Sequence, residues 1–368
     1  MNVTISIFII YIELQLNSTS LKKNILVYYY KLIIMTKNSY IVENPVLLIL
    51  YNRPNYAEQL INQIKKVQPS NLYIFIDSHP DGDDENNVKK IKEVKNLIEN
   101  EIKWNCNKSY NYPTYNLGPS KGPKTAIDWF FNNEKQGIIL EDDCIPSISF
   151  FKFCDELLEK YKKNKKIKII SGDNGSGVLP MKYFEGKDYS YTSLPLIWGW
   201  ASWEDTWREY SSDLGQWSRD INYSNKLKNY YIADKLIVKN IFKRILKHKD
   251  YKNRFWDFQL FSSILENEGI CIIPQKNLVS NIGYGENSTN TKKINYRSNA
   301  TIYEIKTITH LTEVKNIKRN NRILLNTVHV GFNPNFLKFF PVFLLPLFYL
   351  YKRTLYFLSK INVFRRKV

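Results

Sequence analysis

Short apolar runs that end in polar or acidic residues alternate with helical segments through the first half of this 368-residue chain. The runs at 45–51 and 71–76 are almost continuously apolar, as expected of strands buried on both faces. A third strand is expected near 110–115 and a fourth at 137–140. This alternation favours an α/β fold, in which helices flank a mostly parallel sheet.

Apolar residues at helical spacing predict the connecting helices. The predicted helices cover residues 55–66, 88–100, 124–132 and 149–161. A further strand is expected at 167–172. No GxGxxG follows the first strand and the chain has no P-loop sequence, which argues against a classical dinucleotide site and a P-loop phosphate cradle.

Three carboxylates, Glu141-Asp142-Asp143, follow the fourth predicted strand directly. Desolvating three acids is costly unless a cation, a partner or a ligand compensates them. Mg²⁺ and Mn²⁺ prefer carboxylate and phosphate oxygens, and open α/β sheets bind ligands at the carboxyl ends of their strands. The run therefore suggests a metal–diphosphate site, and an acidic turn that caps the next helix is the alternative.

Two aromatic-rich segments stand out in the second half of the chain. The first contains Trp198-Gly199-Trp200 and the second contains Phe255-Trp256-Asp257. Tryptophan clusters are commonly core, because indoles bury a large apolar area. A carboxylate in apolar surroundings has a raised proton affinity, which suits Asp257 to work as a general base. The alternative is an ion pair between Asp257 and Arg254.

The net charge of +18 is concentrated at the C-terminal end. Residues 291–368 hold 15 Lys and Arg against Glu304 and Glu313, which leaves +5 for the other 290 residues. Such a tail suits an anionic partner. The four cysteines form no CxxC pair, so neither a zinc site nor a disulfide framework is indicated, and a reducing compartment is the simplest interpretation.

The basic tail favours a membrane surface over nucleic acid. Its aromatic run at 336–351 is flanked by Lys and Arg, is shorter than the roughly 20 apolar residues that span a bilayer, and contains Pro341 and Pro346. We expect residues 336–368 to bind an anionic membrane surface, with a helix packed on the core as the alternative. Interleaved basic and aromatic residues of the kind that follow a phosphate backbone are missing, so no nucleic-acid partner is expected.

At the other end, the apolar stretch at 5–11 is short, is interrupted by Glu13 and has no cleavage site after it, which argues against a signal peptide. We expect residues 1–34 to be an upstream extension outside the fold. The predicted organisation is an N-terminal extension at 1–44, a catalytic domain at 45–290 and a basic, aromatic-rich region at 291–368.

Six motifs occur along the chain in an order that is typical of one enzyme family. They are Asn52-Arg53-Pro54, Asp77, Asn116-Leu117-Gly118, Glu141-Asp142-Asp143, Trp198-Gly199-Trp200 and Phe255-Trp256-Asp257. The set resembles the GT-A nucleotide-sugar glycosyltransferases, specifically bacterial family-2-like enzymes allied to the N-acetylglucosaminyltransferase I group, as do the segments at 127–153 and 277–283. The resemblance covers about 45–291 and implies a Rossmann-like GT-A fold.

The resemblance also implies roles for individual residues. Asp143 would hold Mn²⁺ or Mg²⁺, and Asp257 would be the catalytic base. Donor-binding roles fall on Asn52, Arg53, Asp77, Lys121, Glu141 and Asp142. The wall for the sugar or acceptor would be formed by Trp198, Gly199, Trp200 and Trp256. One departure is the pair of prolines in Gly118–Pro123, which leaves a phosphate contact by Lys121 open.

These expectations define a metal-dependent transferase that moves a sugar from a nucleoside-diphosphate donor to a hydroxyl of a glycan or lipid-linked acceptor. The expected donor is a UDP-sugar. We expect inversion of configuration, since a base on the face opposite the leaving group inverts the anomeric carbon. We also expect a cytoplasmic protein, peripheral at the inner face of the membrane. The alternatives are an inactive GT-A-fold protein that binds glycan or membrane, and a sugar nucleotidyltransferase.

Overall fold

The computed structural model describes residues 40–80, 82, 84–175, 177, 179, 181–217, 226–284 and 297–329. The chain divides into two compact units, Met1–Ile41 and Val42–Val368. Only Tyr40 and Ile41 of the first unit are described, so the fold below is that of the second unit. The predictions of an upstream extension at 1–34 and of a membrane-binding segment at 336–368 concern residues outside the described ranges.

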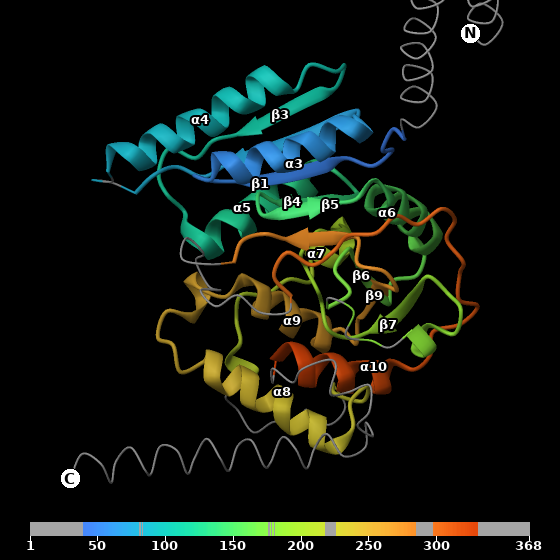
Figure 1. The fold of residues 1–368 in the computed structure, drawn as a ribbon. Coiled ribbons are helices and arrows are strands. Elements are labelled where there is room, and N and C mark those ends of the chain that lie inside the picture. The colour runs from blue at the N-terminus through green and yellow to red at the C-terminus, as the bar shows by residue number, and fades with distance from the viewer. Residues whose placement is uncertain are drawn as a thin grey trace, which may run out of the picture. The chain divides into compact units, whose positions relative to one another are not determined.

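Eight strands form one sheet in the order β3-β2-β1-β4-β8-β6-β9-β7 (Figure 1). They are β1 (Val46–Leu50), β2 (Asn71–Ile76), β3 (Asn107–Asn111), β4 (Gln136–Glu141), β6 (Ile167–Ser171), β7 (Tyr189–Thr192), β8 (Trp200–Trp203) and β9 (Ile270–Pro274). Strands β3, β2, β1 and β4 pair in parallel, and so do β6 and β9, whereas β8 and β7 run antiparallel to their neighbours. The predicted α/β fold with a mixed, mostly parallel sheet is confirmed.

Helices flank both faces of this sheet (Figure 1). They are α3 (Pro54–Val67), α4 (Glu85–Glu101), α5 (Gly118–Asn133), α6 (Ile148–Tyr161), α7 (Glu204–Trp207), α8 (Ile232–Ile245), α9 (Trp256–Glu266) and α10 (Ile317–Leu324), with short turns η1 (Met181–Phe184), η2 (Gly215–Trp217), η3 (Tyr251–Asn253) and η4 (Leu325–His329). A second, two-stranded ribbon pairs β5 (Cys144–Pro146) with β10 (Val279–Asn281).

Local sequence explains most of these elements. All five residues of β1 are buried, because β2 and β4 lie on its two sides and helices cover both faces. Helix α3 begins at Pro54, where a missing N–H costs nothing. Helix α4 begins after Asp84, whose carboxylate accepts from the Asn87 N–H at 2.6 Å. Ser147 caps α6 in the same way, through the Phe150 N–H.

Three predicted boundaries differ from the structure, and one of them is the start of α4, at Glu85 rather than residue 88. Strand β3 covers Asn107–Asn111 rather than 110–115, because its sequence is polar and half exposed at the sheet edge and so carries no apolar signal. Helix α5 begins at Gly118 rather than residue 124. Pro119 is tolerated in the first turn, where backbone N–H groups have no helical partner, and Pro123 removes a single donor deeper in the helix.

Two clusters of buried side chains form part of the hydrophobic core. One lies between the sheet and helices α5 and α9, and contains Phe130, Trp200 and Trp256. The other lies among α8, α9 and α10, where the rings of Trp217 and Phe242 stack 4.0 Å apart. Helix α10 belongs to this second cluster, so the described residues 297–329 are part of the same compact unit as the sheet.

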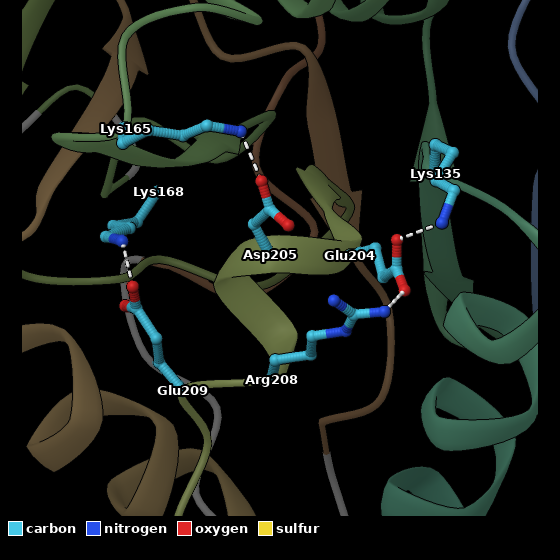
Figure 2. A network of polar contacts seen from close by, with 7 residues as sticks. All are labelled: Lys135, Lys165, Lys168, Glu204, Asp205, Arg208 and Glu209. Atoms are coloured by element: carbon cyan, nitrogen blue, oxygen red, sulfur yellow. Dashed lines mark hydrogen bonds and ion pairs between the residues drawn. The ribbon is translucent and has the colours of Figure 1, made fainter.

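Ion pairs fix α7 at the end of the sheet where β4 begins (Figure 2). Glu204 pairs with Lys135, at 2.6 Å, and with Arg208. Asp205 pairs with Lys165, and Glu209 pairs with Lys168 at 2.6 Å. These ion pairs join α7 and Glu209 just after it to the residues before β4 and β6 and to Lys168 within β6, at the end of β4 opposite the acidic run.

Candidate functional site

A cavity of about 620 Å³ lies at the carboxyl ends of β1, β2 and β4. Its far walls come from the segment before β8 and from the start of α9. Eight of the predicted site residues line it: Arg53, Asp77, Glu141, Asp142, Asp143, Trp198, Trp256 and Asp257. Parallel strands bring their carboxyl ends to one edge, which explains how residues up to 200 positions apart in the chain meet there.

Arg53 neutralises part of the acidic run. Its Nε donates to Asp142 Oδ2 at 3.1 Å, its Nη2 lies 2.5 Å from Asp142 Oδ1, and its Nη1 donates to Asp143 Oδ2 at 3.0 Å. The contact follows from the sheet, since Ile49 of β1 pairs with Glu141 of β4 and the turns after both strands begin side by side. The predicted contact of Arg53 with a nucleotide is not tested by this arrangement.

The segment after β10 positions Asp143. Asn281 Nδ2 donates to Asp143 Oδ1 at 3.1 Å, and the Ile282 N–H donates to the Asp143 carbonyl at 2.9 Å. The Gly283 N–H in turn donates to Asn281 Oδ1 at 2.9 Å. A Cβ at Gly283 would overlap the Asp143 carboxylate. Asn281 and Gly283 line the cavity too, so this segment holds the Asp143 carboxylate in place beside it.

Burial shifts the acids of the run toward their protonated forms. Burial, followed by the charges of Asp143 and Asp142, raises the pKa of Glu141 to about 8. Burial also raises the pKa of Asp142 to about 7, although Arg53 beside it acts in the opposite direction. One guanidinium therefore does not compensate three ionised carboxylates, and a further cation in the cavity would lower both pKa values.

Asp257 lies in the first turn of α9 and lines the cavity. Burial raises its pKa to about 6, while hydrogen bonds from the N–H groups of Phe258 and Asp257 itself act in the opposite direction. Its charge is close enough to contribute to the raised pKa of Glu141. Arg254 lines the same cavity, yet within the described part of the chain no ion pair joins it to Asp257.

Asp77 holds the start of helix α5. Its two carboxylate oxygens accept from the N–H groups of Leu117 and Gly118, each at 3.0 Å, and from that of Ser78 at 2.9 Å. The Asn116 side chain approaches the same carboxylate at 3.4 Å. Four donors thus already surround the carboxylate for which the resemblance implied a donor-binding role, and its visible role is to fix the cavity wall that α5 forms.

The other four predicted site residues do not line the cavity. Asn52 donates to Asn87 Oδ1 at 2.6 Å and so joins the end of β1 to α4. Lys121 is exposed on α5. Gly199 has a φ of +66°, and a Cβ there would lie 2.7 Å from a Val279 methyl group. Trp200 is buried in the core between Trp207 and Trp256.

Trp198 forms a wall that sequence reasoning described only in part. The Arg297 guanidinium lies 3.8 Å from the centroid of the Trp198 ring, and Tyr284 meets the ring edge-on at 5.8 Å. Arg297 also pairs with buried Asp173 at 2.6 Å. Asn281, Gly283 and Arg297 are lining residues with no earlier assigned role, and Arg254, considered before only as an ion-pair partner of Asp257, also lines the cavity. Asn281 and Gly283 lie in the segment 277–283, which the sequence analysis included in the family resemblance. No motif of the sequence analysis includes Arg297.

The acidic run suits a cation that is shared with a diphosphate. Among the described residues, no group of three or more His, Cys, Asp or Glu side chains forms a self-contained metal site. Mg²⁺-like cations in nucleotide enzymes are commonly held by one or two carboxylates together with substrate phosphates. Asp143 offers such a carboxylate at the cavity, and the raised pKa values of Glu141 and Asp142 indicate uncompensated negative charge beside it.

Comparisons with known proteins give distant structural matches only. No protein-family model matches the chain, and no curated protein matches it. An apo UDP-glucose pyrophosphorylase matches at a TM-score of 0.32 and 9% identity, over 64% of this chain and 92% of its own. A mannosyltransferase from Pyrobaculum calidifontis, in complex with GDP-Man and Mn²⁺, matches at 0.30 and 10%, over 66% and 81%. The fold is thus distantly similar to those of nucleotide-sugar enzymes, and similarity at this level carries no argument about the reaction.

The described helices were also compared with the length and hydropathy that a membrane span requires. Throughout the described ranges, none is both long and apolar enough to cross a bilayer.

Proposed function

We propose that this protein is a nucleotide-sugar glycosyltransferase. It moves a sugar from a nucleoside-diphosphate donor, with a UDP-sugar as the first expectation, to a hydroxyl of a glycan or lipid-linked acceptor. The observation that carries the proposal is the single cavity that joins the acidic run after β4 with the half-buried carboxylate of Asp257 on α9. These two features supply the two chemical requirements of glycosyl transfer, which are a stabilised leaving group and a deprotonated acceptor.

The donor half of the site is the acidic run with Arg53. A divalent cation held by Asp143 would neutralise the charge that develops on the leaving diphosphate. Asn281 and the close approach of Gly283 keep the Asp143 carboxylate in place for that role. Arg53 holds Asp142 and Asp143 together before donor arrives, and its guanidinium is a suitable partner for phosphate oxygens as well as carboxylates.

The acceptor half is Asp257. A carboxylate whose pKa is about 6 is ionised at neutral pH and still basic enough to take a hydroxyl proton in the transition state. Asp257 therefore accepts the proton as the acceptor oxygen attacks the anomeric carbon and the bond to the diphosphate breaks. Attack from the face opposite the leaving group inverts the configuration. Trp198 and Trp256 provide apolar walls for a sugar ring.

The same carboxylate favours a transferase over a sugar nucleotidyltransferase. A nucleotidyltransferase uses a sugar phosphate, whose attacking oxygen is already ionised and needs no base. Glycosyl transfer to a hydroxyl does need one. An inactive scaffold has no use for a half-buried carboxylate without an ion pair, because such a group costs free energy when it ionises.

Calorimetry with UDP, GDP, CDP and TDP, with and without Mn²⁺, tests the proposal. We expect one nucleotide to bind in a metal-dependent manner and Asp143→Ala to weaken that binding at least about tenfold. Asp205→Ala is the matched control, because Asp205 is an exposed acid at the opposite edge of the sheet. Absence of binding by any nucleotide to the folded wild-type chain would contradict the donor assignment.

A further inference from the structure

Helix α8 presents an exposed stripe that is apolar at one end and basic at the other. Ile232 is 88% exposed and Leu236, one turn later, is 45% exposed. Lys239 and Lys243 follow on the same side of the helix, at positions i+7 and i+11 from Ile232. Tyr231, just before the helix, is 41% exposed. Large apolar side chains exposed next to basic ones suit a partner that offers both an apolar layer and negative charge.

Packing fixes which side of α8 faces outward. Ile237, Val238, Ile241 and Phe242 are buried in the second core, on the side opposite the stripe. The buried carboxylate of Asp234 accepts from Arg322 Nε of helix α10 at 2.9 Å, and α8 and α10 lie side by side (Figure 1). The Arg322 guanidinium also covers the Tyr231 ring at 3.9 Å. The exposure of the stripe is therefore set by the fold.

The charge around the stripe is mostly positive. Residues 231–254 contain eight Lys and Arg and two Asp. One of these acids, Asp234, is buried in its pair with Arg322, so Asp250 is the only acid of this segment at the surface. Lys243, Arg244 and the basic residues that follow them are exposed. A surface of this kind attracts an anionic layer.

The same basic segment reaches the cavity. Turn η3 follows α8, and the Lys252 carbonyl in it accepts from Ser120 Oγ of α5 at 3.3 Å. Two residues later, Arg254 lines the cavity. A partner that covers α8 would thus also lie near the rim of the cavity.

We propose that α8, with the basic segment through Arg254, docks this protein on an anionic lipid bilayer. Ile232 and Leu236 enter the boundary between headgroups and acyl chains, while the lysines and arginines contact lipid phosphates. A nucleic acid offers phosphates but no apolar layer for two exposed aliphatic side chains. Charge and exposed apolar area together therefore favour lipid. The inference is independent of the proposed reaction, and docking would also bring the cavity close to lipid-borne acceptors.

Flotation of the full chain with vesicles tests this inference. The vesicles are phosphatidylcholine alone or mixed with phosphatidylglycerol, and the variants are Ile232→Ser/Leu236→Ser and Lys243→Ser/Arg244→Ser. We expect wild type to bind only the mixed vesicles, with each double variant weaker by on the order of tenfold or more. Lys89→Ser/Lys92→Ser on α4 is the control, because it removes two exposed lysines from another helix.

Amide hydrogen exchange locates the contact without relying on variants. Mixed vesicles should slow exchange in Ile232–Ile245 and leave exchange in Glu85–Glu101 unchanged. Three outcomes overturn the inference: wild type that does not bind mixed vesicles, double variants that bind as tightly as wild type while melting at the same temperature, or unchanged exchange in α8. A dimer that the variants dissociate would assign the stripe to a second copy of the chain instead.

Discussion

Asp143 and its neighbours illustrate how the site is built from single contacts. The carboxylate accepts from Asn281 on one oxygen and from Arg53 on the other. The first contact fixes its position, and the second supplies a positive charge. Because both partners come from distant parts of the chain, the properties of the acidic run depend on the folded sheet rather than on the sequence Glu-Asp-Asp alone.

Gly283→Ala tests this positioning. The added Cβ would occupy the space of the Asp143 carboxylate, so Asp143 must move. We expect metal-dependent nucleotide binding to weaken by about tenfold or more, with a far-ultraviolet spectrum like that of wild type. Calorimetry checks the affinity. Ser280→Ala is the control, since Ser280 precedes Asn281 in β10 and pairs with Ile145 of β5. Equal losses in both variants would argue against a specific effect at Gly283.

The pH dependence of transfer should report Asp257. Burial raises its pKa to about 6, so the base is protonated and inactive below that pH and ionised above it. We expect kcat/KM to rise through about pH 6 and then level off. Initial rates in overlapping buffers give the profile. A rate that falls as pH rises through this range would contradict the assignment of Asp257 as a base.

Residue patterns predicted the acidic run and Asp257 because both are local, whereas the partners of these residues are not. The sequence separates Arg53 from Asp142 by 89 positions and Asn281 from Asp143 by 138. Trp198 and Trp200 looked equivalent, yet one lines the cavity and the other is core. The positive φ of Gly199 between them redirects the chain, and no pattern of residue types specifies that turn.

At the scale of elements, helix α5 depends on Asp77. Three backbone N–H groups donate to this carboxylate, and two of them belong to the start of the helix. Asp77→Ala leaves those donors buried without an acceptor. We expect a loss of about 1–3 kcal/mol in the free energy of unfolding, in the absence of any nucleotide. Urea unfolding measures it, and unchanged stability would return Asp77 to a purely ligand-binding role.

The elements themselves followed from sequence wherever the apolar signal was strong. Strands β1 and β2 and helices α3 and α6 lie within a residue or two of their predicted bounds. Strand β3 did not, because an exposed edge strand needs no apolar face. The early start of α5 also escaped prediction, since the cap comes from Asp77 on another strand rather than from the residue that precedes the helix.

At the scale of the whole molecule, the buried pair of Asp234 and Arg322 joins α8 to α10. Arg322→Met removes one partner and leaves a carboxylate buried without a counterion. We expect a loss of about 3–5 kcal/mol in the free energy of unfolding. Denaturant unfolding provides the measurement. The double variant Asp234→Leu/Arg322→Met should recover most of this loss, and no recovery would mean that Arg322 acts through its packing on Tyr231 instead.

The fold class of the molecule was predictable from sequence, whereas the C-terminal extent of the folded unit was not. Alternating strands and helices indicated the sheet, and the carboxyl ends of its strands indicated where the cavity lies. No residue pattern predicted that residues 297–329 return to the second core, because α10 contributes only short apolar stretches whose partners on α8 and β7 are more than 70 residues away.

The most direct test of the proposed reaction compares wild type with Asp257→Asn. Sugar transfer is measured with saturating donor of the nucleotide class that calorimetry identifies. Asparagine keeps the size of the side chain but cannot accept the proton, so we predict a fall in kcat of about 10²–10⁴-fold with nucleotide affinity unchanged. Transfer by Asp257→Asn at the wild-type rate would contradict the account, because Asp257 is the cavity carboxylate to which the proposal assigns the proton of the acceptor hydroxyl.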